Sequence, residues 1–560
     1  MRKLILILSL PLLIFAQSGN QSQSIELPDF VITGRQQVDL PVMKKAKVEP
    51  VSILSKEYFF PAFTPEQFTL ATVAKPKQLI ADLFPAETAY NKQLILGAGQ
   101  YTLPTGQFYF AQPFSVGKFY SKLWGTNQKD YVDYADFNVS GINLGTNFYI
   151  NRSSEFLPGS IINIDAQFLR NEYNFFSPYR PINSTPVKRE TQDFSGLLSL
   201  QNYYGEVFKY NFKFGGNQID IKDADTKEMN LYFGGNTKLL FGDFSLLLSG
   251  KFHNQSVSKN TTDDDYNFIA VKGGIEYQLT SALILRGGVS YYSTDVKRFS
   301  LSNTSFGIVK EDFIAPWGEA EFLFNDNLSL TTTYNQEIDF KTYTDLLRIN
   351  RYTYINNPLQ PALGFDNSST VYNHKIDVVL TYGYKKYYEL SFGGTYFTAD
   401  DYSFFNSDFS FDNTPVHMDK FYVDRINDVT GYSVYANALY HLGPFGWFYG
   451  DAKYEVTETD NNNTIPYHPK LSLKAAYGYK FGFGLSAELK LHYLKDTYID
   501  LENSILLDDY INLSAELRFS LTQNFDITLH LNNLLNRDNY IWLGYIEPPF
   551  DFTAGIDFRF

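Results

Sequence analysis

The chain has 560 residues, a formal net charge of −14, no cysteine and an aromatic content of 17%. The negative charge argues against nucleic acid as a partner, because phosphate contacts need Lys and Arg, and the lack of cysteine excludes disulfide frameworks and thiolate metal sites. Beyond the first twenty positions no run of 18 apolar residues occurs, so we expect no membrane-spanning helix. Aromatic and polar residues are interleaved and the mean hydropathy is −0.25, which is typical of strands that face lipid on one side and water on the other.

The first residues have the organisation of an export signal. Arg2 and Lys3 precede the almost wholly apolar stretch 4–15, and Ala16 supplies a small residue before a cleavage point. The apolar stretch is too short to span a membrane. It therefore predicts a removable signal peptide over residues 1–16 and an exported mature protein.

Residues 17–92 form a segment of different composition, with seven prolines and only two glycines. Proline at this density interrupts helices and strands alike. We therefore expect an extended periplasmic segment that can partly enter a barrel lumen, and no compact domain.

From residue 93 onward, apolar and polar residues alternate with a period of two. In 485–493, every odd position is apolar and every even position is polar, and the same pattern runs through 511–521 and 208–214. Side chains on a strand alternate between its faces, so each such segment has one apolar and one polar wall. The expected strands are 93–102, 107–117, 119–128, 133–151, 161–175, 191–204, 206–221, 227–241, 243–258, 266–280, 282–297, 312–325, 327–340, 371–386, 387–401, 421–442, 445–460, 468–481, 483–499, 506–521, 525–537 and 550–560.

Many of these segments are longer than the roughly 9–11 residues that a tilted strand needs to cross a bilayer. Short turns are expected at 242–243, 281–282, 326, 443–444, 482 and 522–524. Longer polar connections are expected at 176–190, 298–311, 341–370, 402–420 and 538–549. All the short turns fall at one end of the strands, and short periplasmic turns with longer external loops are the pattern of outer-membrane barrels. A soluble sandwich would explain the alternation but not this pattern. The sequence thus predicts an all-β fold, a transmembrane antiparallel β-barrel of about 22 strands over residues 93–560, in contact with outer-membrane lipid.

The last strand carries a separate signal. Phe552, Ile556, Phe558 and Phe560 share one face, and the sequence ends on an aromatic residue. This resembles the signal read by the outer-membrane barrel-assembly machinery, which we expect as a partner. The alternative is that Phe is simply common in this chain.

The C-terminal residues also resemble a known family. The sequence Leu-Asn-Asn-Leu-Leu-Asn-Arg at 531–537, then Tyr540, Gly544-Tyr545 and the closing stretch 552–560 are similar to the end of TonB-dependent receptors. Leu535 stands where that family usually has Phe, and Pro548-Pro549 where it usually has Pro-Gly. The resemblance implies a 22-stranded barrel, wide enough to need a plugged lumen.

A second stretch, 27–35, is similar to the segment through which these receptors touch the TonB complex. The resemblance assigns the contact to a β-prone run that can add to a partner's sheet edge. The contact candidates are Asp29, Phe30, Val31, Ile32, Thr33 and Gly34. The alternative is a β-prone piece of a tail. Because 17–92 is shorter than the plug domain of the family, the resemblance supports the barrel better than it supports energised transport.

Something must close so wide a barrel. The candidates are the N-terminal segment, the connections 341–370 and 402–420 folding inward, or a separate chain such as a plug or surface lipoprotein. The side chains expected to face the lumen include both positive and negative charges. They suit either a peptide that fills the lumen or a water-filled passage. They include Lys209, Lys213, Lys474, Glu488, Lys490, Glu516 and Arg518.

The expected function is uptake or binding of a nutrient in the bacterial outer membrane. The alternatives are a structural or secretion-associated barrel that docks partner proteins, and a passive porin. The seven histidines show no paired spacing, and no Gly-rich phosphate loop follows a strand. Asp263, Asp264 and Asp265 offer oxygen ligands for Ca²⁺ but fit a solvated loop better. We therefore expect no enzyme and no catalytic, cofactor or metal site, and the ligand stays unassigned.

Overall fold

The structure is a computed structural model. It describes residues 91–560 apart from 180–183, 203–204, 206, 260–261, 301–304, 356–367, 385–387, 409–416 and 442–445. The predicted signal peptide, the segment 17–92 up to residue 90 and the TonB-contact candidates Asp29 to Gly34 lie outside the described residues. Among the described residues, no helix is both long and apolar enough to cross a membrane.

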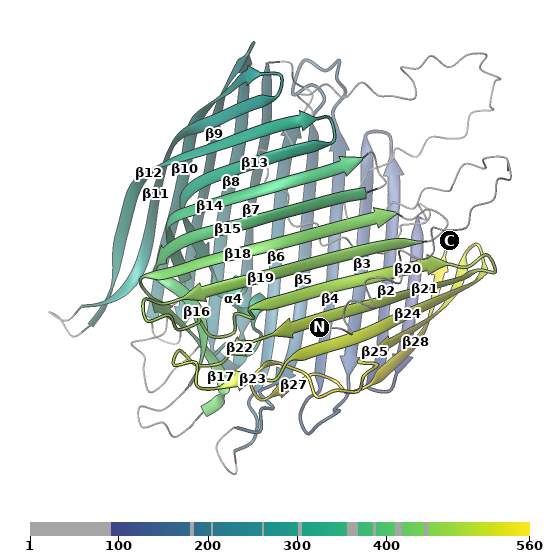
Figure 1. Cartoon of the computed structure of the whole chain (residues 1–560). Helices are drawn as coiled ribbons and strands as arrows, with labels where there is room; N and C mark the ends of the chain where they lie inside the picture. The colour runs from purple at the N-terminus through teal and green to yellow at the C-terminus, as the bar shows by residue number, and fades with distance from the viewer. Residues whose placement is uncertain are drawn as a thin grey trace, which may run out of the picture. The chain divides into compact units, whose positions relative to one another are not determined.

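One sheet of 22 strands makes up the barrel (Figure 1). Its strands in chain order are β1 (Lys92–Gly99), β2 (Thr102–Phe114), β3 (Gly117–Gln128), β4 (Phe137–Tyr149), β5 (Ile161–Asn174), β6 (Lys188–Asn202), β7 (Phe208–Ile221), β8 (Thr226–Phe241), β9 (Phe244–Lys259), β10 (Thr262–Thr280), β11 (Leu283–Ser300), β12 (Ser305–Asn325), β13 (Leu328–Lys341), β14 (Ser368–Tyr384), β15 (Tyr388–Asp400), β18 (Val429–His441), β19 (Trp447–Glu458), β20 (Leu471–Lys480), β21 (Leu485–Lys495), β24 (Tyr510–Thr522), β25 (Phe525–Asn532) and β28 (Asp551–Arg559).

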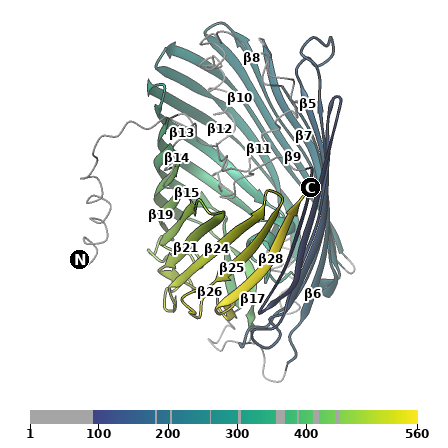
Figure 2. The same cartoon turned by 90° about the vertical axis from the view of Figure 1, so that its right-hand side faces the viewer.

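Each strand pairs antiparallel with the next, and the last strand pairs with the first. The register places Leu94 opposite Phe558, and the backbone of Lys92 exchanges two hydrogen bonds with Phe560, at 3.1 and 3.0 Å. Figure 2 shows β28 beside the first strands of the chain. Closure leaves the sheet without a free edge. The predicted all-β antiparallel barrel of 22 strands is therefore confirmed.

The two faces of the wall differ as the alternation predicts. On β9, Leu246 and Leu248 are exposed on the outer face, whereas Ser245 and Val257 are buried on the inner face. A closed sheet with exposed Leu, Val, Ile and Phe on its outside is stable only where lipid covers that surface. The barrel is thus of the transmembrane, outer-membrane type.

The two ends of the barrel differ as well. The turn end carries short connections such as Gly242-Asp243 between β8 and β9, and both Lys92 and Phe560 lie there. The opposite end, the loop end, is at the bottom of Figure 1. It carries the remaining elements, η3 (Lys222–Ala224), α4 (Tyr343–Ile349), β16 (Tyr402–Asp408), β17 (His417–Ile426), β22 (Thr497–Tyr498), β23 (Leu506–Leu507), β26 (Tyr540–Trp542) and β27 (Tyr545–Ile546).

Several predicted boundaries differ from the structure, and two of them differ by most of an element. The expected strand 421–442 is two strands, β17 and β18, because Asp428 adopts a left-handed φ of 57°. Asn-Asp is a turn signal that the longer alternation hid. The expected loop 298–311 is mostly strand, since β11 and β12 continue as a hairpin until Ser300 pairs with Ser305.

Candidate functional site at the loop end

Three connections fold inward at the loop end, and we call them together the lid. They are the α4 connection 342–355, the hairpin of β16 and β17, and the connection 533–550. Their side chains meet those of other connections in a buried cluster, whose members are Ala135, Tyr173, Phe175, Phe176, Tyr352, Phe421 and Tyr545. These residues lie on strand ends and connections that are spread around the barrel. The lid therefore crosses the mouth instead of standing around its rim.

The centre of the lid is a group of stacked and edge-on rings. The rings of Tyr352 and Tyr545 are stacked with their centroids 3.4 Å apart. Trp542 lies edge-on to Phe421 at 5.2 Å and 4.9 Å from Tyr467. Such aromatic pairs contribute roughly 0.5–1.5 kcal/mol each beyond the area that they bury. Aromatic packing thus joins the three lid connections, and two backbone hydrogen bonds between Phe421 and residues 352 and 354 join the α4 connection to β17.

The guanidinium of Arg351 lies over several rings of this region. The Arg351 guanidinium is 5.2 Å from the ring centroid of Phe137, 5.6 Å from that of Tyr173 and 5.0 Å from that of Tyr352. Phe137 begins β4, which lies almost half-way round the barrel from β13. Arg351 also donates to the Tyr352 hydroxyl at 2.8 Å. A cation held over aromatic faces is a favourable arrangement, and here it ties the α4 connection to the far side of the mouth.

Burial in the lid changes two proton affinities. Burial raises the pKa of Tyr352 to about 12, although Arg351 acts in the opposite direction. Burial also raises the pKa of the Glu547 carboxyl, and the Arg351 guanidinium partly offsets that rise. Of these groups Arg351 is exposed, whereas the rings of Tyr352 and Tyr545 are buried. An exposed guanidinium at the mouth suits anionic solutes.

The α4 helix begins with two sets of polar contacts. Thr342 and Asp345 form a capping box, with each side chain bonded to the backbone N–H of the other residue. Glu228 of β8, which is fully buried, accepts the N–H of Tyr343 at 2.8 Å and the N–H of Thr344 at 3.0 Å. A carboxylate at the first turn of a helix is stabilised by the free N–H groups there. The start of α4 is thus attached to the inner wall.

Neighbouring strands contribute to the same attachment. Asn217 of β7 donates to the Thr344 hydroxyl at 2.8 Å, and Gln255 of β9 donates to Glu228 at 2.6 Å. Apolar contacts surround these bonds, because Tyr343 and Leu346 of α4 belong to a buried cluster with wall and connection residues. The other buried members are Ile219, Ile221, Ala224, Val257, Tyr266 and Ile355.

A second attachment holds the end of the α4 connection. Arg189 of β6 is fully buried, donates to the Thr353 carbonyl oxygen and pairs with Asp223 at 3.0 Å. Arg348 reaches Asp193, also on β6, at 3.3 Å. Removing one partner from a buried pair of this kind leaves an uncompensated charge. The connection is therefore held by charged groups at its end and by Glu228 at its start.

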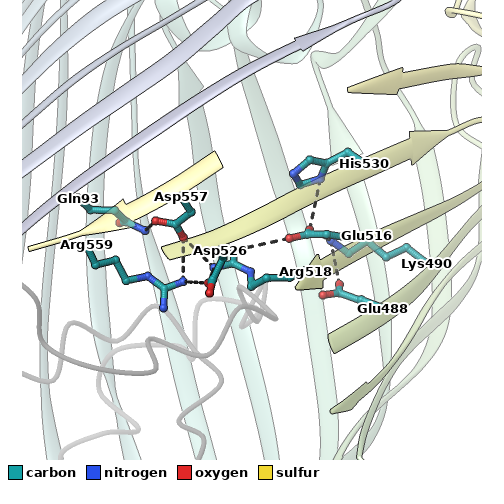
Figure 3. Close-up of polar contacts among 9 residues, drawn as sticks. All are labelled: Gln93, Glu488, Lys490, Glu516, Arg518, Asp526, His530, Asp557 and Arg559. Carbon is teal, nitrogen blue, oxygen red and sulfur yellow. Dashed lines mark hydrogen bonds and ion pairs between the residues drawn. The ribbon is translucent and has the colours of Figure 1, made fainter. Parts of the chain in front are cut away.

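The inner wall at the turn end carries two further ionic networks. Figure 3 shows the first: Arg559 lies 2.6 Å from Asp526 and 2.8 Å from Asp557, and Gln93 of β1 donates to Asp557 at 2.9 Å. This network joins both strands of the closing seam. It continues through Arg518 to Glu516, Lys490, Glu488 and His530.

The second network lies on a different part of the wall, on β8 and on β10 to β12. Arg286 of β11 pairs with Glu276 at 2.8 Å and Glu321 at 2.9 Å, and it also contacts Glu319. Lys238 of β8 reaches Glu276 at 2.6 Å. The expectation that both signs line the inner wall is thus met. In both networks the cations are shared among carboxylates that outnumber them by one.

The structure places the remaining predicted residues as follows. The four assembly-signal candidates Phe552, Ile556, Phe558 and Phe560 are all exposed on the outer face; their recognition by the assembly machinery stays a prediction. The described residues contain no cluster of three potential metal ligands. The connections 341–370 and 402–420 contribute inward-folding parts of the lid.

Sequence reasoning missed α4, Glu228 and Arg189. The helix had a signal, because Thr342 and Asp345 have the spacing of a capping box ahead of apolar residues. Glu228 and Arg189 had none, since each is one more polar residue on the inner face of an alternating strand.

Known proteins were compared with this chain in sequence and in structure. The sequence matches no family model and no curated protein. The structure is similar to the siderophore receptor PiuA from Acinetobacter baumannii, with a TM-score of 0.62 and 11% identity over 84% of this chain and 82% of that chain. It is similar to the FrpB iron transporter from Neisseria meningitidis, with a TM-score of 0.62 and 11% identity over 85% and 82%.

A third similar structure is the copper transporter OprC, with a TM-score of 0.59 and 13% identity over 84% of this chain and 80% of that chain. At these identities the likeness concerns the fold. Residues 92–560 make up the same share of the chain, about 84%, that these likenesses cover. The chain therefore has the barrel fold of outer-membrane receptors and transporters, as its C-terminal resemblance to TonB-dependent receptors implied.

Proposed function

We propose that this protein is an outer-membrane uptake receptor of the TonB-dependent type, which takes in a nutrient ligand at its loop end. The lid carries the proposal: three connections close the mouth and place Arg351 among aromatic rings. The barrel fold, which is similar to that of proteins named as a siderophore receptor, an iron transporter and a copper transporter, supports it. A passive porin would keep its mouth open to water.

The orientation follows from the connections. Outer-membrane barrels have short periplasmic turns and longer external loops. The loop end with the lid then faces the medium, and Lys92 faces the periplasm. The segment before β1 would reach a periplasmic partner directly.

Energy coupling is the finer part of the proposal. Phe30, Val31, Ile32 and Thr33 would add a strand to the TonB protein, and the segment 17–92 would connect that strand to the barrel. Support comes from the sequence of 27–35 and its resemblance to the family segment.

The test compares nutrient depletion from the medium by cells that carry the intact protein, a variant lacking 27–35, or Arg351→Ala. We expect the same compounds to remain in the medium with both variants, because one loses energy and the other loses ligand contacts. Crosslinking to TonB should be lost only with the deletion. Depletion by both variants equal to that by the intact protein would contradict the proposal.

A second candidate function, docking of a partner protein, has one observation in its favour. The hairpin of β11 and β12 extends past β13 (Figure 1), and β12 pairs with β13 only from Gly318 onward. Ile314 is 72% exposed there. Co-purification of a stoichiometric partner that is lost on Ile314→Asp would favour this candidate.

A further inference from the structure

The α4 connection differs from the other lid connections in the way it is held. The hairpin of β16 and β17 meets the α4 connection through rings and through two backbone hydrogen bonds between Phe421 and residues 352 and 354. The connection 533–550 combines ring contacts with two hydrogen bonds between the Asn539 side chain and the backbone of Ile511. The start of α4 is centred on one buried carboxylate, that of Glu228, which receives two backbone N–H groups and the Thr344 hydroxyl, while Asn217 donates to the same hydroxyl.

Water can replace the hydrogen-bond donors that α4 supplies to Glu228. The hydrogen bonds that the structure records for this carboxylate come from backbone N–H groups, a hydroxyl and the Gln255 amide. If α4 moved away, lumenal water could replace its two backbone N–H groups and the Thr344 hydroxyl, while Gln255 of β9 would stay beside Glu228 on the wall. The first-turn N–H groups of the helix would be hydrated as well. A hydrogen bond that water can replace contributes only modestly to the net stability of a closed state.

The apolar surface beneath the connection is, in contrast, dry when α4 is in place. Val257 of β9 is 1% exposed and Tyr266 of β10 is fully buried, and both belong to the cluster that contains Tyr343, Leu346 and Ile355. Access of a reagent to Val257 therefore reports on whether the connection has left the wall.

We propose that residues 342–355 form a gate with Glu228 as its latch. The gate opens when α4 leaves the wall of β6 to β9 as one unit, and solutes reach the inner wall beneath it only in that state. The aromatic centre of the lid lies at the other end of the same connection, at Tyr352. A solute that inserts between Tyr352 and Tyr545 would compete with the packing that helps to keep the gate closed. This coupling rests on the proposed function, whereas the latch itself does not.

The test uses the absence of cysteine in the chain. Val257→Cys is introduced as a reporter in the full-length protein, which is purified in detergent, where its labelling does not depend on orientation or transport. A bulky maleimide should label it slowly compared with Phe156→Cys, whose native side chain is 75% exposed. Adding Glu228→Gln should speed labelling at Val257→Cys about tenfold, because charge-assisted hydrogen bonds are roughly twice as strong as neutral ones.

Two further variants keep the test decisive. Thr344→Val removes the hydroxyl from the helix side of the latch and should also speed labelling. Glu321→Gln, a buried carboxylate of the turn-end network, is the matched control and should leave labelling unchanged. Heat-modified migration on gels shows that each barrel is folded. Labelling of the reporter as fast as that of Phe156→Cys would overturn the gate, and unchanged rates with both Glu228→Gln and Thr344→Val would overturn the latch.

Discussion

The barrel wall and the lid are built by different kinds of interaction. In the wall, each residue faces lipid or lumen according to its place in an alternating strand, and backbone hydrogen bonds join neighbours around the ring. In the lid, the deciding contacts join residues far apart in the chain, such as Glu228 with Tyr343 or Tyr352 with Tyr545. The local alternation of residues thus specifies the barrel wall, and individual long-range contacts specify the lid that closes it.

The largest effect is expected in the turn-end network of the wall. Arg286→Met leaves Glu276, Glu319 and Glu321 without their shared cation, and removal of one partner from a buried ionic group costs about 3–5 kcal/mol. Urea unfolding in detergent should show this loss for the whole barrel. Lys213→Met is the control, because Lys213 lies on the same wall but is exposed. Equal stability of both variants would show that the network does not stabilise the wall.

The next prediction tests the two faces of one strand. Leu248 is exposed on the outer face of β9, and Ser249 follows it on the inner face. Leu248→Lys should cost about 2–4 kcal/mol, the cost of a cation at the middle of a lipid-facing wall. Ser249→Lys should cost much less, because its side chain faces the lumen. A reversed order in folding titrations into lipid vesicles would contradict the assignment of faces.

In the lid, loss of a single aromatic ring should destabilise the α4 connection without destabilising the barrel. Tyr352→Leu removes the stacking on Tyr545, worth roughly 0.5–1.5 kcal/mol. Hydrogen exchange in residues 342–355 should then become about three to ten times faster, while barrel unfolding stays unchanged. Tyr354→Leu, which removes an edge-on contact with Tyr422 at 5.5 Å, is the matched control for a ring outside the central cluster. A global loss of stability with Tyr352→Leu would contradict the separation of lid and wall.

The smallest effect is a pH dependence of the lid. Because burial raises the pKa of Glu547 in the folded lid, its protonated form is favoured there relative to the open state. The lid should be tightest below the ordinary carboxyl pKa of about 4.3. It should loosen as the pH rises from that value through the raised one. Hydrogen exchange across 533–550 measures this change, and Glu547→Gln should remove it. The same pH dependence in that variant would assign it to another group.

The sequence predicted the wall well and the lid hardly at all. The number of strands followed from the alternation in stretches such as 485–493 and from the short turns, which all lie at one end of the strands. Each residue's polarity indicates which face of its strand it occupies. The helix over 343–349 could have been predicted from its capping box. The roles of Glu228, Arg189 and Arg351 could not, because they depend on partners 100 residues or more away in the chain. Only the folded ring brings those partners together.

The closed mouth is tested most directly by oxidative crosslinking in this cysteine-free chain. In Asn217→Cys with Thr344→Cys, the two replaced side chains are in hydrogen-bond contact at 2.8 Å across the lid and wall. The wall pair Asn163→Cys with Ser199→Cys, in contact at 3.0 Å on β5 and β6, gives the reference. We predict that both pairs form disulfides in most folded molecules on intact cells. Crosslinking of the wall pair alone would show that α4 does not rest on the wall and that the mouth is open.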